Sequence, residues 1–134
     1  MLFRYAILTV FVTFLLILIG GLVHATGSSL ACPDWPLCFG KVFPKMEGGV
    51  FYEHGHRIMA SLVALLTFGL ALWLWRDKQE DPWMRYLGWA AFILVLFQAG
   101  LGGITVIFRL PLFVSATHLS VAMFFFALLV YLTC

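Results

Sequence analysis

Four long apolar stretches constrain the fold of this 134-residue chain more than any other feature. A helix that crosses the hydrocarbon core of a bilayer needs ~20 consecutive, mostly apolar residues. The stretches that meet this requirement are Tyr5–Val23, Tyr52–Trp75, Tyr86–Phe108 and Leu112–Thr133. Because 63% of the residues are hydrophobic, a soluble domain of this size has too little interior to bury them. We therefore expect an all-α, polytopic membrane protein with four transmembrane helices.

The connections between these stretches predict how the helices are arranged. Residues 24–51 form a long polar loop, whereas residues 76–85 and 109–111 are short connections. Short connections place successive helices side by side and antiparallel. We expect a single domain, residues 1–134, built as an antiparallel four-helix bundle. The first stretch is too long for the apolar region of a signal peptide, and no small-residue cleavage site interrupts it before Gly20-Gly21, so we expect it to remain a helix.

The loop 24–51 carries the residues that predict the orientation of the chain. Lysine and arginine give no preference, because equal numbers lie on the two sides of the membrane. Cys32 and Cys38 flank PDWPL in this loop, and a disulfide persists only in an oxidising compartment. We therefore expect a disulfide outside the plasma membrane and both termini, with an unpaired Cys134, in the cytoplasm. Two free thiols are the alternative, because spacing alone does not establish disulfide geometry.

Two histidines lie within the predicted spans, where ionisable groups are costly and mark functional sites. His56 is about four residues into the second stretch and His118 about six into the fourth. At 1.5 Å per residue, their depths below the outer surface differ by only ~3 Å. A neutral imidazole is the commonest metal ligand, and two facing imidazoles provide the axial ligands of six-coordinate haem iron. The pair therefore predicts a haem site; the alternatives are an interhelical hydrogen bond and a zinc site, for which no third ligand is evident.

Charged neighbours of His56 suggest further roles at this site. Glu53 and Arg57 share one helix face with His56, because residues three and four apart are neighbours on a helix. They either form an ion pair at the helix start, where a glutamate is favoured, or act on a bound ligand. In the second case Glu53 would stabilise positive charge on a substrate, and Arg57 would bind a haem propionate. His54 points away from this face, and we expect it and His24 at the headgroup level as polar surface residues.

Glycine pairs near the outer surface suggest an internal repeat. The first stretch ends in IGGLVHATG and the third in LGGITVIF. Small residues allow helices to approach each other closely. Four residues of the third stretch have two interpretations, close approach to a large flat ligand or helix packing alone: Gln98, Gly100, Gly102 and Gly103.

Several motifs occur together and in order: TGSSLACPDWPLC in the loop, EHGHR at the start of the second stretch, QAGLGG in the third and ATHLS in the fourth. In this combination the chain resembles the amino-terminal half of haem A synthase, an eight-helix family built from two four-helix halves. The resemblance implies an oxidoreductase that converts the methyl group of haem O to the formyl group of haem A for terminal oxidases. It implies ligation of the substrate haem iron by His56 and His118, and a position near the reacting methyl group for Glu53. The outer-loop disulfide of the family matches Cys32 and Cys38.

The second half of the family's structure, with the histidine pair that binds a haem b cofactor, has no counterpart in this sequence. We therefore expect a homo-oligomer that rebuilds a two-site enzyme within the lipid bilayer. The resemblance also implies haem O synthase and the terminal oxidase assembly as partners, whereas a net charge of +2 gives no reason to expect nucleic acid.

Two alternative functions are a bis-histidine cytochrome b for electron transfer and a haem-binding protein without catalytic activity. Electron transfer requires neither a carboxylate nor a cysteine pair beside the haem. Glu53 and the two loop cysteines therefore favour the enzyme.

Overall fold

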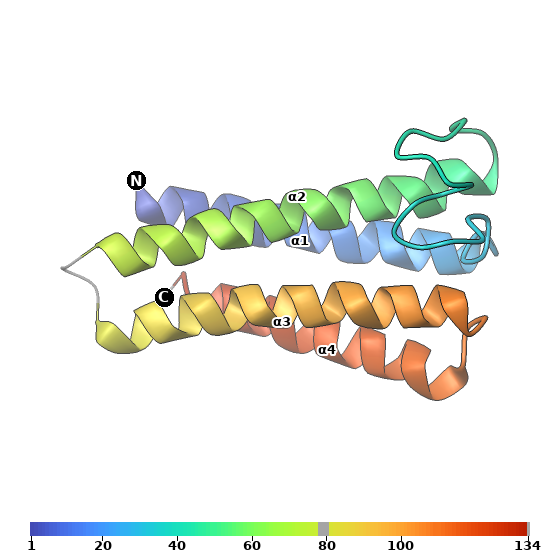
Figure 1. Cartoon of the computed structure of the whole chain (residues 1–134). Coiled ribbons are helices and arrows are strands. Elements are labelled where there is room, and N and C mark those ends of the chain that lie inside the picture. Colours follow the sequence, from blue (N-terminus) through green and yellow to red (C-terminus); the bar gives the residue numbers. More distant parts are fainter. Residues whose placement is uncertain (78–80, 134) are drawn as a thin grey trace.

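The computed structural model describes residues 1–77 and 81–133 of the chain. These residues form helices and no β-strand. The helices are α1 (Leu2–Ala25), α2 (Gly49–Arg76), α3 (Pro82–Ile107) and α4 (Leu112–Tyr131), shown in Figure 1. Each of the four is long and apolar enough to cross a membrane, which confirms the predicted all-α membrane protein. Cys134, expected to be an unpaired thiol, lies outside the described residues.

The helix starts differ most from the prediction. α1, α2 and α3 begin three, three and four residues before the predicted starts at Tyr5, Tyr52 and Tyr86. At α3 the reason is capping: the Asp81 carboxylate accepts a 2.9 Å hydrogen bond from the backbone N–H of Trp83, and Pro82 occupies the first turn. Capping residues are polar or lack an N–H group, so an apolar stretch does not reveal them.

The helices run antiparallel and pack in a ring, in which each helix contacts its neighbours along the chain and α1 also contacts α4. Figure 1 shows both termini at one end of the bundle. The segment 26–48 covers the opposite end, where the short turn between α3 and α4 also lies. We call this the loop end of the bundle.

The apolar core lies in the half of the bundle next to the termini. Its buried members come from all four helices and include Ala6, Leu70, Ala91 and Leu129. Large apolar side chains on the outer faces of the helices are exposed, as expected for a surface that meets lipid rather than water. The histidines and glycine pairs lie in the other half, at the loop end.

Candidate functional site

Each histidine of the predicted pair lies against a glycine of the preceding helix. A Cβ atom added to Gly20 of α1 would be 3.1 Å from Cε1 of His56 on α2. A Cβ atom added to Gly102 of α3 would be 3.2 Å from Cε1 of His118 on α4. Gly20 and Gly102 are the first glycines of the two pairs in the sequence repeat. The glycine repeat is therefore structural, because the first glycine of each pair contacts one imidazole, in α1–α2 and again in α3–α4.

The two imidazoles are not fully satisfied by protein groups. Nδ1 of His56 and Nδ1 of His118 are buried, and neither has a hydrogen-bond partner in the described part of the chain. A buried polar atom without a partner costs ~1–3 kcal/mol. The buried Nδ1 atom without a partner on each ring favours a ligand site over a fully satisfied interhelical hydrogen bond.

Further buried polar atoms gather around His118. Nε2 of Gln98 on α3 donates a 2.6 Å hydrogen bond to the backbone carbonyl of His118. Oε1 of Gln98 and Oγ of Ser115 are buried and have no partner among residues 1–77 and 81–133. Gln98 thus ties α3 to α4 beside the imidazole. Two imidazoles, one from α2 and one from α4, are a donor set that suits haem iron.

Alanine at the seating glycines tests this arrangement. We expect Gly20→Ala and Gly102→Ala to displace the facing imidazole, because the added methyl group would contact the ring at 3.1 or 3.2 Å. Overpacking typically costs ~1–3 kcal/mol, which corresponds to a roughly 5- to 150-fold loss of haem affinity in a titration of the purified variants. Gly21→Ala and Gly100→Ala are matched controls, because a Cβ at either position meets no atom within 4 Å. Equal losses in the controls would contradict the seating role.

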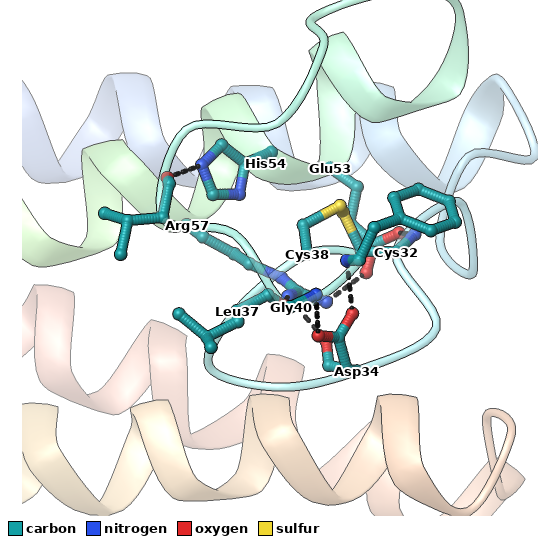
Figure 2. The surroundings of a disulfide bond; sticks show 10 residues. Cys32, Asp34, Leu37, Cys38, Gly40, Glu53, His54 and Arg57 are labelled. Atoms are coloured by element: carbon teal, nitrogen blue, oxygen red, sulfur yellow. Dashed lines mark hydrogen bonds and ion pairs between the residues drawn. A yellow bond between two sulfur atoms is a disulfide. The ribbon is translucent and has the colours of Figure 1, made fainter.

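Glu53 and Arg57 form an ion pair that holds the disulfide loop (Figure 2). Nη2 of Arg57 lies 2.7 Å from Oε1 of Glu53, and both side chains are largely buried. Oε2 of Glu53 accepts a 2.7 Å hydrogen bond from the backbone N–H of Cys32. Nη1 of Arg57 donates to the backbone carbonyls of Asp34 and Leu37. The ion pair considered from the sequence is therefore present, and it joins the first turns of α2 to the loop.

Cys32 and Cys38 form the expected disulfide, with an Sγ–Sγ distance of 2.03 Å. Both residues are fully buried. The bond closes the PDWPL segment into a ring over the start of α2. The alternative of two free thiols is therefore not the state found in the structure.

Thiol labelling provides a check on this disulfide in the isolated protein. Under denaturing, non-reducing conditions only Cys134 is expected to react, because the other two cysteines of the sequence are paired. Mass spectrometry would count one label per chain before reduction and three after it. Three labels before reduction would contradict the disulfide.

Asp34 holds the exposed turn that follows Cys38, a role that the sequence did not predict. Its carboxylate accepts hydrogen bonds from the backbone N–H groups of Phe39 at 2.6 Å and Gly40 at 2.7 Å. The bond from Gly40 is the strongest of the influences that lower the pKa of this carboxyl group. Because the pKa is lowered in the folded state, the contribution of Asp34 is present above its unfolded pKa and is lost as the pH falls through the folded pKa.

Trp35 connects the loop to α3 by packing against Gly103. A Cβ atom added to Gly103 would lie 2.7 Å from Cδ2 of the Trp35 ring, so only glycine fits at this position without a shift of the loop. The neighbouring Gly102 seats His118. In the glycine pair of α3, Gly103 therefore contacts the loop and Gly102 contacts the His118 imidazole. In the sequence, only the position of a large aromatic residue, Trp35, between the two cysteines could have indicated this contact.

His54 does not lie at the surface, so the prediction for this residue is wrong. It is only 5% exposed, and its Nε2 atom lies 2.9 Å from the backbone carbonyl oxygen of Val42. The loop folds back over this face of α2, which the helical period of α2 alone does not reveal. His24, by contrast, is exposed near the end of α1, as predicted.

The relatives found by comparison with known proteins carry the same name. The chain is 34% identical over 131 residues to a protein named Heme A synthase from Alkalihalophilus pseudofirmus, a match that covers 96% of this chain and 44% of the relative. It is 37% identical over 132 residues to Heme A synthase from Bacillus pumilus, with 93% of this chain and 42% of the relative covered. The chain thus spans less than half the length of these relatives. No solved structure gives a significant match.

The family comparison covers nearly the whole chain. Residues 3–50 and 46–134 match the COX15-CtaA family, whose members are described as cytochrome oxidase assembly protein. These ranges include the disulfide loop and both seated histidines. The chain therefore belongs to the COX15-CtaA family of cytochrome oxidase assembly proteins.

Proposed function

We propose that this chain binds haem between His56 and His118 and takes part in the oxidation of the haem O methyl group to the formyl group of haem A. The observation that carries the proposal is the pair of imidazoles on α2 and α4, each seated on a glycine and each with an unpartnered Nδ1 in the described structure. Imidazole nitrogens are good ligands of haem iron. The relatives named Heme A synthase support the reaction, which would make the chain an oxidoreductase with haem O as substrate.

Glu53 is proposed as the catalytic carboxylate. The Cys32 N–H and the Arg57 guanidinium hold its two oxygens on the turn of α2 that precedes His56. A carboxylate held in this way stabilises positive charge that develops on the methyl carbon and needs no reorganisation during the reaction. Each of two successive hydroxylations would add one water to that carbon and pass two electrons to an external electron acceptor, with two protons released to solvent. The resulting geminal diol loses water to form the aldehyde.

Arg57 is proposed to bind a haem propionate. Three of its donated hydrogen bonds go to Glu53 and the loop carbonyls, and a guanidinium group has further N–H donors. Charge-assisted hydrogen bonds to a carboxylate are short and strong. Arg57 would in this way link the position of the substrate to the position of Glu53.

We further propose a homo-oligomer in the plasma membrane, with the loop outside and both termini in the cytoplasm. The disulfide supports this orientation, because such bonds persist in an oxidising compartment. The chain offers one seated histidine pair, and a second copy would supply a second site, for haem b. Haem O synthase and the terminal oxidase assembly are the partners that would deliver the substrate and accept the product.

Identification of the extracted haems tests the proposed function. The protein would be produced in a host that makes haem O but has no haem A synthase of its own, and its pigments separated by chromatography. Haem A, or haem O hydroxylated on the methyl group, is the expected result. Haem b alone would contradict the oxidation and favour an electron-transfer cytochrome b with the same histidine ligands.

A further inference from the structure

A second cluster of potential ligands lies beside the haem site but shares no residue with it. Cys32, Cys38 and His54 are all buried, and one ligand atom from each lies within 4.8 Å of the others. Figure 2 shows the loop cysteines and His54 of α2 beneath the same stretch of the loop. His54 and His56 are two residues apart and therefore point to different faces of α2. The cluster is thus separate from the histidine pair.

The hydrogen bond of His54 prepares its imidazole to act as a ligand. Nε2 lies 2.9 Å from the Val42 carbonyl oxygen, which can only accept, so Nε2 carries the proton and Nδ1 carries the free lone pair. Nδ1 is buried and has no hydrogen-bond partner in the described residues. Metal-binding histidines typically donate their other ring N–H to a backbone carbonyl or a carboxylate, which sets the tautomer and the ring orientation. His54 has this arrangement, and two sulfur atoms lie close to its ring.

We propose that Cys32, Cys38 and His54 form a redox-gated site for one soft cation, Cu(I) or Zn(II). Two thiolates and one imidazole are the donor set that both ions prefer. At ordinary metal–ligand lengths of ~2.0–2.3 Å, the donor atoms around one ion lie roughly 3.5–3.8 Å apart. The ligand atoms of the cluster lie within 4.8 Å of one another, a limit about an ångström above that spacing. The two sulfurs, which are bonded at 2.03 Å, must separate before they can bind an ion.

The disulfide acts as the gate. In the oxidised loop the sulfurs are bonded to each other and cannot bind a cation as thiolates. A dithiol reductant would attack one sulfur, form a mixed disulfide and leave as its own disulfide, so that Cys32 and Cys38 gain two electrons and two protons. The incoming cation then displaces the two thiol protons to solvent. Exchange of the two thiolates with an external disulfide, which is reduced to its dithiol, would re-form the Cys32–Cys38 bond and release the ion.

Metal titration of the oxidised and reduced full-length chain in mild detergent tests this proposal. A phosphine would reduce the disulfide, and thiol counting would verify three thiols per wild-type chain and two per Cys134→Ser chain. The phosphine would then be removed under anaerobic conditions. The reduced chain carrying Cys134→Ser is expected to bind one equivalent of Zn(II) or Cu(I), and the oxidised chain to bind at least about tenfold more weakly. Co(II) as a probe should give thiolate-to-metal charge-transfer bands only after reduction. Separate titrations with Zn(II) and Cu(I) would identify which ion the site prefers.

Histidine variants separate this site from other ligands in the chain. His54→Ala is expected to weaken metal binding by about tenfold or more, whereas His24→Ala, at an exposed position, should leave it unchanged. The bis-histidine haem spectrum reports on the fold of the variants independently of the metal. The proposal is overturned if the folded chain resists reduction, if oxidised and reduced wild-type chains bind equally, or if His54→Ala binds like wild type. The comparison of redox states does not use His54→Ala and stands if that variant does not fold.

Discussion

Alanine in place of His56 or His118 is expected to abolish the low-spin, bis-histidine absorption spectrum of the haem-loaded protein. Each imidazole would supply one axial ligand to the haem iron. Because His56 lies on α2 and His118 on α4, the remaining histidine cannot also occupy the second axial position. Loss of one ligand leaves five-coordinate or water-ligated iron, which has a high-spin spectrum. Absorption and electron paramagnetic resonance spectra of the ferric protein, together with the haem content per chain, would measure the change.

His24 provides the control for this experiment. His24→Ala removes an exposed imidazole near the end of α1 and should leave the spectrum intact. If both His56→Ala and His118→Ala keep the low-spin spectrum, the histidine pair is not the haem ligand set. If only one of them loses the spectrum, a different residue completes the coordination.

Glutamine in place of Glu53 is expected to stop the conversion of haem O while haem remains bound. The substitution keeps the size of the side chain and one oxygen, but removes the charge that would stabilise a cationic intermediate at the methyl carbon. His56 and His118 are unchanged, so haem O or its singly hydroxylated form should accumulate in the pigment extract. Chromatography of the extracted haems would measure this.

The buried setting of Glu53 requires a control for structural damage. Its carboxylate is paired with Arg57, with side-chain exposures of 5% and 13%, and loss of one member of a buried ion pair costs ~3–5 kcal/mol. Glu47 offers a matched comparison, because its 2.9 Å pair with Lys45 is exposed and should contribute ~1 kcal/mol or less. Glu47→Gln should therefore convert haem O normally. Normal conversion by Glu53→Gln would remove this residue from the mechanism, and loss of haem would make it a structural residue that holds the loop.

The local pattern of the sequence was enough to predict the number of helices and their antiparallel order, whereas for the disulfide it left two free thiols as an alternative. Membrane spans are determined by length and hydropathy within one segment, because each must satisfy its backbone hydrogen bonds internally. The glycine repeat also proved structural, since Gly20 and Gly102 seat His56 and His118 in the same way. The starts of α2 and α3 were missed because the residues that begin these helices lie outside the apolar stretches.

Tertiary structure alone decided what surrounds the first turns of α2. The hydrogen bond from Cys32 to Glu53 spans 21 residues, and the contact of Trp35 with Gly103 joins the loop to another helix. His54, which the helical period placed at the surface, is buried because the loop folds back over it. The path of this loop depends on the disulfide, the buried ion pair and the glycine of α3 together. No single segment contains that information, whereas each transmembrane helix is specified by its own residues.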